Sequence, residues 1–419
     1  MIPPHKSKNL PSYQATPSAY ERNLLTNNPM QPQVNPPYIR TIEEMIADPE
    51  DKLVIDVRRF EDFREETYPG AIHIFIEELF SRREELPKDG RHIYLLCYSG
   101  RNSEEVAKDL QQEGYLIYSI QDGYYSYIRL RMRDLLQKEE ATTRKCKEIE
   151  RSIIKRFRRE IWSRFTRAIN TYQLIQDGDK LAVCISGGKD SFLMAKLFQE
   201  LHRHGKQNFE VVYLVMNPGY NETNYQAILD NAQLMNVPIT VFTSEIFDIV
   251  AGEGEASPCY HCARMRRGAL YHKAKELGCN KIALGHHYDD VIETILMGML
   301  YGGQVQTMMP KLHSTNFPGM ELIRPLYLIR EDDIKRFRDS NQLRFIACAC
   351  RLTESCASCG GTDRGSKRAE IKNLIRHLHE QNPYVEANIF KSVENVSLNT
   401  IIEYKTGDGK RHNFLDQYD

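Results

Sequence analysis

The sequence predicts a small α/β domain followed by a larger, doubly wound α/β domain with a parallel sheet, and three observations lead to this fold class. Between residues 38 and 130, short apolar runs alternate with stretches of helical periodicity. The same alternation returns from 179 to about 330, which is the pattern of a sheet covered by helices on both faces. Within this second region, at 181–198, an apolar run passes through a glycine turn into a helical pattern.

Length and composition narrow the class of protein. A chain of 419 residues with 41% hydrophobic residues is expected to form two to three domains. Its 56 basic and 57 acidic residues nearly cancel, so a nucleic-acid partner must meet a local basic face. The sequence shows no 18-residue apolar run and no apolar secretory signal, so we expect a cytoplasmic protein without a membrane partner. In that reducing compartment, the ten cysteines are expected to be ligands or reactive thiols.

The first part of the chain divides into an arm and a domain. Residues 1–37 are rich in Pro, Asn, Gln and Ser, which predicts an extended, weakly ordered arm. Residues 38–130 then carry apolar strand patterns and helical patterns that build the small domain. The predicted strands are Leu53–Asp56 and His92–Cys97, and the predicted helices are Phe60–Glu66 and Ser103–Glu113.

A basic helical segment at 131–172 is expected to link the two domains. It lacks Gly and Pro, and it carries the chain's densest run of cations, which includes Arg156, Arg158, Arg159 and Arg164. Two interpretations remain open: a solvated linker helix, or a helix that lies along a phosphate backbone while Trp162 and Phe165 pack on its other face. The larger domain is expected at 173–385, and a C-terminal segment at 386–419.

The glycine turn at 186–191 has the chemistry of a phosphate site. A strand, a glycine turn and a helix N-terminus direct backbone N–H groups and the helix dipole at one point. Lys189 adds a positive charge, and Asp190 suits Mg²⁺ held beside phosphates. The turn resembles the PP-loop of the N-type ATP pyrophosphatases, and this resemblance implies that ATP is bound and cleaved between its α- and β-phosphates. The residues that carry the resemblance are Ser186, Gly187, Gly188, Lys189, Asp190 and Ser191.

A second strand-to-helix junction, at Leu284–Thr294, places two adjacent carboxylates beside histidines. Such a pair is costly unless a cation or a proton relay uses it. We therefore expect Asp289 and Asp290 to bind Mg²⁺ or to activate the substrate, and Gly285 and His286 to contact the nucleotide. An N-cap aspartate beside a solvated one is the structural alternative. The PP-loop resemblance also implies that Met216, at the end of the strand 210–216, contacts adenine.

Cys97 follows a buried strand and precedes a helix, in Cys97-Tyr98-Ser99-Gly100-Arg101. A helix N-terminus and a neighbouring arginine favour a thiolate, and loop N–H groups can stabilise a persulfide. Residues 39–130 resemble the rhodanese family, and the residues that carry the resemblance are Ile55–Arg58, Tyr68–His73, Cys97–Asn102 and Gln121–Tyr124. The resemblance implies that Cys97 is the sulfur-carrying nucleophile. Arg101 stands one place early, and Asn102 stands where the family usually has Arg.

Six further thiols lie in three clusters beyond residue 250. They are Cys259 and Cys262, Cys348 and Cys350, and Cys356 and Cys359. Four thiolates around zinc are one interpretation, and a [4Fe–4S] cluster on three thiolates, with one iron open, is the other. The remaining cysteines at 146, 184 and 279 stand in helix or strand contexts and are expected to be packing residues.

Residues from 150 to about 400 resemble the tRNA 2-thiocytidine synthetase family, whose Pro-Cys-x-x-Cys-Ala-Arg-x-Arg-Arg-Gly motif is matched at 258–268. This resemblance implies a [4Fe–4S] cluster held by Cys259, Cys262 and one later cysteine. Cys348 aligns best with that third ligand, and Cys350 is its rival, because this chain has Cys-Ala-Cys there. Cys356 and Cys359 are not assigned to this cluster, and we expect them either to bind zinc or to be free thiols.

Together these motifs predict an ATP-dependent tRNA sulfurtransferase of the 2-thiocytidine type, fused to its own sulfur carrier. ATP would activate a carbonyl oxygen as an adenylate, and sulfur carried on Cys97 would replace it. The expected partners are tRNA and a cysteine desulfurase or other sulfur donor. A PP-loop thiolase acting on a small molecule or another RNA base is an alternative, as is a non-catalytic nucleotide-binding redox sensor. The sequence leaves open the thiolated base, the donor and whether the chain forms a homodimer.

Overall fold

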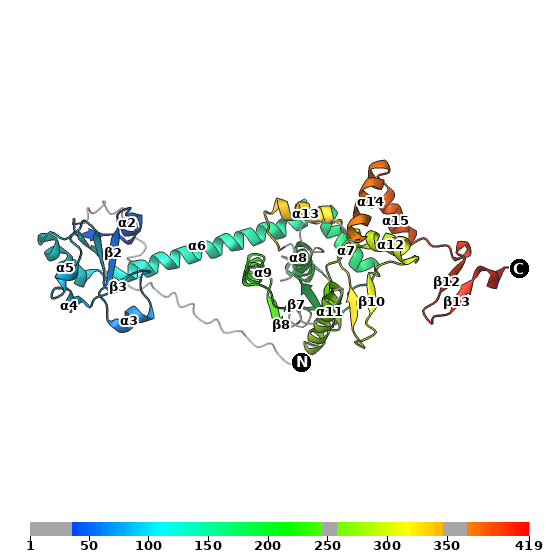
Figure 1. Cartoon of the computed structure of the whole chain (residues 1–419), viewed down its shortest axis with the longest axis horizontal. Helices are drawn as coiled ribbons and strands as arrows, with labels where there is room; N and C mark the ends of the chain where they lie inside the picture. Colours follow the sequence, from blue (N-terminus) through cyan, green and yellow to red (C-terminus); the bar gives the residue numbers. More distant parts are fainter. Residues whose placement is uncertain (1–35, 206, 245, 247–257, 347–366, 419) are drawn as a thin grey trace, which may run out of the picture. The chain divides into compact units, whose positions relative to one another are not determined.

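The computed structural model describes residues 36–205, 207–244, 246, 258–346 and 367–418, with the backbone alone at 258–263 and 417. The chain divides into two compact units, at residues 1–138 and 139–419. Each unit is built around its own sheet (Figure 1). Among the described residues, no helix is both long and apolar enough to cross a bilayer.

The first unit has a five-stranded, fully parallel sheet in the order β1-β5-β4-β2-β3. Its strands are β1 (Ile39–Arg40), β2 (Lys52–Asp56), β3 (Ile72–His73), β4 (His92–Leu96) and β5 (Ile117–Ile120). Its helices are α2 (Ile42–Ala47), α3 (Phe60–Glu65), α4 (Ile76–Leu79), the 3₁₀ turn η1 (Arg83–Glu85) and α5 (Arg101–Gln112). The predicted α/β pattern of this region is confirmed.

Side-chain alternation gives this sheet two apolar faces. Leu95 packs on one face with Val106 and Leu110 of α5. Leu96, the next residue of β4, packs on the opposite face with Met45 of α2 and with the first turns of α6 (Gly123–Arg151). Helices therefore cover both faces of the sheet from which the loop of Cys97 departs.

The second unit has a six-stranded sheet in the order β10-β11-β9-β6-β7-β8. The strands are β6 (Lys180–Ile185), β7 (Glu210–Asn217), β8 (Ile239–Thr243), β9 (Lys281–Ala283), β10 (Lys311–His313) and β11 (Glu321–Ile323). All pairs are parallel except β10 with β11, an antiparallel edge that the sequence patterns did not reveal. The predicted doubly wound parallel sheet is confirmed for the remaining strands.

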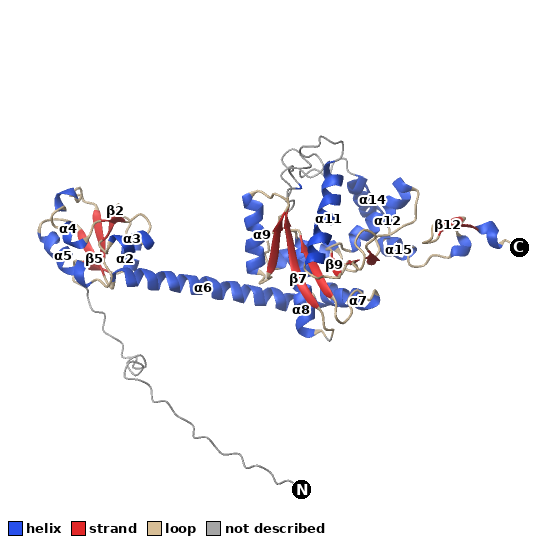
Figure 2. Cartoon of the chain, turned by 90° about the horizontal axis from the view of Figure 1, so that it is seen from below, coloured by secondary structure: helices blue, strands red, loops and turns tan. Residues whose placement is uncertain are grey.

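Helices cover both faces of this sheet as well (Figure 2). Val183 packs with α7 (Ser163–Thr171), α8 (Lys189–His204), α9 (Glu222–Leu234) and α13 (Glu331–Ser340). Its neighbour Cys184 faces α11 (Pro258–Glu276) with Tyr271 and Ala274. A third layer joins α12 (Tyr288–Gly302) to α14 (Lys367–Gln381) and α15 (Val385–Ser392). The chain ends in η5 (Leu398–Thr400), the hairpin β12 (Glu403–Lys405) and β13 (Arg411–Asn413), and η6 (Phe414–Gln417).

The basic helical segment departs from a plain α-helix. It begins earlier than expected, at Gly123, and passes through two π-helical segments, η2 (Ser152–Arg156) and η3 (Arg158–Trp162), before α7. Every fourth residue from Ile149 to Ile169 is apolar and buried. In an α-helix, each fourth residue is turned by roughly 40° around the axis, since 3.6 residues make one turn. The wider π turns take up this drift, so the apolar stripe stays on the core. The predicted boundaries at 130/131, 172/173 and 385/386 stay predictions.

Candidate functional site

The loop after β6 forms a closed anion cradle at the N-terminus of α8. Gly187 adopts a left-handed conformation with φ of 86°, and a Cβ there would overlap the side chain of Ile346. Ser191 closes the loop, because its Oγ accepts from the Ser186 N–H at 3.2 Å and donates to the Gly188 carbonyl at 2.9 Å. No side chain caps α8 at Gly188, so the first-turn N–H groups remain directed at the loop.

Lys189 and Asp190 are the first two residues of α8, and they differ in how completely their charged groups are paired. Lys189 Nζ lies 3.1 Å from Asp190 Oδ2 and 3.3 Å from Glu331 Oε1. Asp190 Oδ1 is buried and has no hydrogen-bond partner among the described residues. A buried acceptor without a donor is costly, so this oxygen suits a bound cation. The loop and this carboxylate therefore fit a nucleotide with Mg²⁺.

The junction after β9 adjoins this loop. A Cβ built on Gly285 would lie 3.4 Å from the Ser191 nitrogen, which places the two predicted motifs side by side. The next residue, His286, has its Nδ1 buried without a partner among the described residues. Burial lowers the pKa of His286 to about 4, so its imidazole is neutral near pH 7.

The two adjacent carboxylates are held by protein groups. Asp290 forms a capping box with His287, in which the His287 N–H donates to Asp290 Oδ2 at 2.9 Å, and its Oδ1 pairs with Arg368 at 2.6 Å. Asp289 accepts from the Glu331 N–H at 2.7 Å and pairs with Arg330 at 3.2 Å. The N-cap of α12 is thus His287, and both carboxylates have cationic partners. No group of three or more metal-ligating side chains was found in the described part of the chain, so their Mg²⁺ role stays a prediction.

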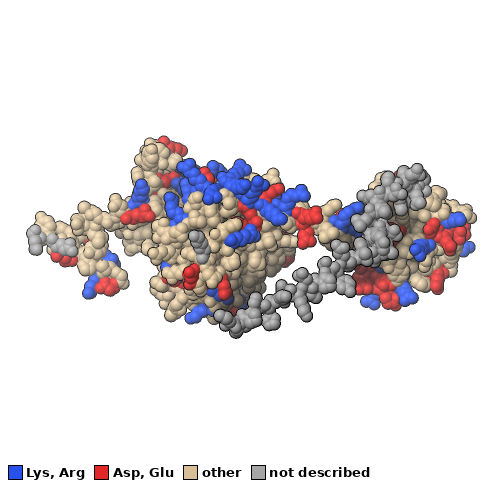
Figure 3. Space-filling view, turned by 180° about the vertical axis from the view of Figure 1, so that it is seen from behind, with Lys and Arg blue, Asp and Glu red and all other residues tan. Residues whose placement is uncertain are grey.

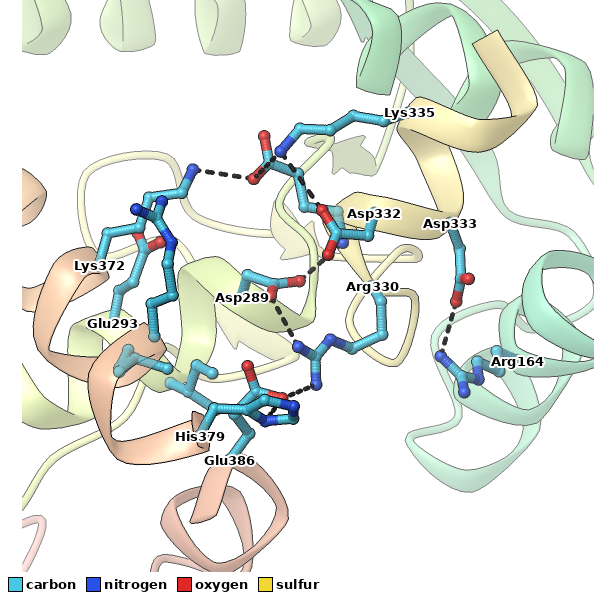
Figure 4. Close-up of a pocket in the computed structure, with 14 residues that line it drawn as sticks. Arg164, Asp289, Glu293, Arg330, Asp332, Asp333, Lys335, Lys372, His379 and Glu386 are labelled. Carbon is cyan, nitrogen blue, oxygen red and sulfur yellow. Dashed lines mark hydrogen bonds and ion pairs between the residues drawn. The ribbon is translucent and has the colours of Figure 1, made fainter. Parts of the chain in front are cut away.

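A charged cavity of about 480 Å³ lies beside these carboxylates (Figure 4). Asp289 and Arg330 line the cavity and point toward one another, and Lys335 of α13 and Lys372 of α14 also line it. Sequence reasoning missed Arg330, Glu331, Arg368 and Lys372. The acidic run Glu331–Asp333 signals a helix start, but no motif spacing connects it with the loop at 186–191.

Met216, the predicted adenine contact, is buried near the end of β7. Its side chain packs in a hydrophobic cluster with Ile246 and the partly buried Phe242 and Met265. This placement shows a packing residue at the carboxyl edge of the sheet. Contact with a nucleotide stays a prediction.

In the first unit, Cys97 lies at the end of β4 against the N-terminus of α5. Its Sγ accepts from the Gly100 N–H at 3.1 Å and from the Ser103 hydroxyl at 3.1 Å, and Ser103 lies 2.8 Å from Ser119. The loop packs tightly on Gly123, where a Cβ would overlap the Cys97 carbonyl. The arrangement supplies donors to a sulfur anion, as expected for a carrier thiol. Arg101 is exposed on the first turn of α5.

The structure describes only some of the residues that were predicted to bind a metal. Cys259 and Cys262 lie on the first turns of α11, where the backbone alone is described. Cys348, Cys350, Cys356 and Cys359 lie outside the described residues. The cysteines expected to be packing residues, Cys146, Cys184 and Cys279, are buried free thiols.

Comparisons with known proteins agree with this geometry. A rhodanese-like domain model matches residues 40–130, and a PP-loop domain model matches residues 158–350. The tRNA-cytidine(32) 2-sulfurtransferase of Coxiella burnetii (strain RSA 331 / Henzerling II) is 33% identical over 256 residues, which cover 60% of this chain and 95% of that protein. The enzyme of the same name from Shewanella baltica (strain OS185) is 35% identical over 249 residues, covering 58% and 74%.

Among solved structures, the U34-tRNA thiolase NcsA from Methanococcus maripaludis with its [4Fe-4S] cluster is similar with a TM-score of 0.44. The similarity covers 55% of this chain and 76% of that chain at 22% identity.

Proposed function

The chain belongs to the tRNA-cytidine(32) 2-sulfurtransferase family, and we propose that it uses ATP to replace the 2-oxygen of a tRNA cytidine with sulfur. The oxygen would attack the α-phosphorus, and the bond to the bridging oxygen would break to release pyrophosphate. Sulfur would then attack carbon 2, and AMP would leave with the original oxygen. The observation that best supports this proposal is the cradle at 186–191, with its unpartnered Asp190 Oδ1.

We assign the nucleotide to the two adjoining junctions. The N–H groups of α8, Ser186, Ser191 and Lys189 would bind the phosphates, and Asp190 would bind Mg²⁺. Gly285 leaves room beside this loop, and the neutral His286 would contact the nucleotide. Asp289 and Asp290 would orient the arginines with which they pair, Arg330 and Arg368. Alternatively, the two carboxylates would release these arginines and bind the metal.

The first unit would carry the sulfur on Cys97. The Gly100 N–H and the Ser103 hydroxyl, which donate to Cys97 Sγ, would stabilise sulfur bound there as a persulfide. Its transfer to carbon 2 needs two electrons to free it from Cys97, which an external thiol would supply. A [4Fe–4S] cluster held by Cys259, Cys262 and Cys348, or by Cys350 in place of Cys348, would supply an open coordination position for sulfur. A zinc site on the same thiols is the alternative.

The π-helical segments present a basic surface for the tRNA backbone. Arg156, Arg158 and Arg159 are exposed, and none of them forms an ion pair with a described residue. Lys and Arg side chains gather into a broad field on one face of the second unit (Figure 3). Arg164 differs from the other predicted cations, because it pairs with Asp333 at 3.0 Å. Phosphate contacts would position the RNA without reading its sequence.

Mass spectrometry of tRNA nucleosides tests this function. Cells of the native host that lack the protein should lose 2-thiocytidine, and the wild-type chain should restore it while Lys189→Ala should not. Loss of another thiolated base instead would shift the substrate to that base. An unchanged set of thiolated nucleosides would favour a small-molecule substrate or a non-catalytic role.

A further inference from the structure

Three lysines converge on the carboxylate of Glu331, the first residue of α13. Lys189 Nζ lies 3.3 Å from Oε1, while Lys335 and Lys372 lie 3.0 and 2.9 Å from Oε2. The lysines come from α8, α13 and α14, so one side chain joins three helices beside the loop at 186–191. Glu331 is 14% exposed, so water replaces few of these contacts.

The same short segment also holds the second junction. The Glu331 N–H donates to Asp289 Oδ2 at 2.7 Å, and Arg330 pairs with Asp289 Oδ1 at 3.2 Å. Arg330 in turn pairs with Glu386 at 2.6 Å (Figure 4). Residues 330 and 331 therefore connect the phosphate loop with the junction at 285–290, although neither motif lies near them in the sequence.

The charge of Glu331 is needed to hold this cluster together. Burial alone would raise the pKa of Glu331, but Lys372, Lys335 and Lys189 hold it well below its usual value, so the carboxylate is charged. Lys189 also lies 3.1 Å from Asp190 and Lys335 lies 3.4 Å from Asp332, so the three ammonium groups share three carboxylates, and Glu331 is the one that all of them contact. A free lysine side chain loses conformational freedom when it is fixed in one position. Because Lys189 is already fixed, this loss of freedom does not add to the barrier when charge develops on the leaving group.

We propose that Glu331 is a positioning residue for adenylation, and that it holds Lys189, Lys335 and Lys372 where the leaving pyrophosphate is bound. This role rests on the proposed ATP-dependent function. As the bond between the α-phosphorus and the bridging oxygen breaks, its electron pair stays with pyrophosphate, and ordered ammonium groups stabilise the charge that develops there.

Glu331→Gln tests the role, because glutamine keeps the size of the side chain and removes its charge. In the full-length protein, with tRNA, ATP, Mg²⁺ and sulfide, kcat for AMP formation should fall at least tenfold. The KM for ATP and the calorimetric Kd for ATP should not rise, since the three cations remain and only the charged carboxylate that they share is lost. Glu331→Asp should recover part of kcat, because it restores the charge. Asp339→Asn, on the exposed end of the same helix and paired with Arg338, is the matched control and should behave as wild type.

Several outcomes would overturn the role. A wild-type kcat for Glu331→Gln, or a rise in KM alone, would show that Glu331 does not act in the chemical step. Equal losses in the Gln and Asp variants, with lower melting temperatures, would make the residue structural. Should Glu331→Gln fail to fold, Lys372→Gln is the second variant. It removes one cation from the same carboxylate and should lower kcat with unchanged KM, and a wild-type kcat there would reject the cluster. Wild-type protein that forms no AMP would instead overturn the proposed function itself.

Discussion

Lys189 and Asp190 contact each other although they are adjacent in the sequence, with Nζ 3.1 Å from Oδ2. Neighbouring residues on a helix ordinarily point in different directions. Here the two side chains meet, Lys189 also reaches Glu331 of α13, and Asp190 Oδ1 remains buried and unpartnered among the described residues. The first turn of α8 therefore holds a cation and a buried carboxylate oxygen that has no partner in the described protein. We base the assignment of the nucleotide site on these two groups.

Lys189→Ala and Asp190→Ala should each lower AMP formation by about 100-fold or more, since a positive charge or a Mg²⁺ ligand is lost from the phosphate site. Circular dichroism should show an unchanged fold, because both side chains lie at the start of the helix. Lys180→Ala, on the same sheet but paired with Glu210, is the control and should retain activity. Release of AMP and pyrophosphate at the wild-type rate by both variants would reject the nucleotide site.

His286 should make the second unit less stable in mild acid. Its folded-state pKa of about 4 lies below the ordinary value near 6.5, so the unfolded chain takes up a proton first as the pH falls. Stability contributed by the neutral ring is present above about pH 6.5 and is lost toward pH 4, with about 2 kcal/mol gone at pH 5. Urea unfolding of wild type and His286→Gln at pH 7.5 and 5 measures this loss. An equal pH dependence in both proteins would contradict the shift.

The sequence predicted the strands of five residues or more because each carries a continuous or alternating apolar run, as Leu181–Ile185 does between polar ends. The edge strand β10 escaped prediction because it is short and lies exposed or half-exposed, so no apolar run marks it. The π-helical segments escaped because apolar residues at every fourth position also read as an ordinary helix.

The sequence could predict the candidate site only where residues close together in the sequence form it. Ser186–Ser191 forms a loop through local contacts, and Cys97 receives its donors from the next six residues. Glu331 and Arg368 come from distant elements, and their contacts with Lys189 and Asp290 depend on how α13 and α14 pack. Asp290 has one local partner, His287, which caps the same helix, whereas its ion pair with Arg368 depends on tertiary packing that a motif does not encode.

Anaerobically purified protein should be brown and contain about four irons per chain, if three thiolates hold a [4Fe–4S] cluster. Cys259→Ala and Cys262→Ala should each remove the colour, and iron analysis with visible absorption measures the result. Loss of colour in Cys348→Ala but not in Cys350→Ala would support Cys348 as the third ligand, and the reverse would assign Cys350. Stoichiometric zinc without iron after anaerobic reconstitution would replace the cluster with a zinc site.

Replacing Arg156, Arg158 and Arg159 by Glu should weaken tRNA binding and flatten its salt dependence. Each phosphate contact contributes about 0.7 to 0.9 to the slope of log K against log salt, so a triple variant should lose about two units or more. Arg164→Ala should change the slope less, because that cation is already paired with Asp333. Filter binding or anisotropy over a range of salt concentrations measures the slopes. An unchanged slope in the triple variant would leave the segment as a structural helix.

Cys97→Ser should separate sulfur delivery from adenylation. With thiosulfate or a cysteine desulfurase as donor, the sulfur must pass through a thiolate at Cys97, which serine does not provide, so 2-thiocytidine formation should be lost. With free sulfide, no carrier is needed, and thiolation with ATP cleavage should continue at the wild-type rate. Ser103→Ala, which removes one donor to Sγ, should slow only the carrier-dependent reaction.

The pattern across donors decides between carrier and docking roles for the first unit. Loss with every donor, sulfide included, would mean that Cys97→Ser damages the enzyme as a whole, and unfolding measurements on the first unit would show it. Full thiolation with every donor would mean that the thiol carries no sulfur, so that the unit's role would be to dock a partner. Loss confined to thiosulfate and the desulfurase is the result expected from a thiol with two hydrogen-bond donors at the N-terminus of α5, because those donors stabilise a persulfide but take no part in cleaving ATP.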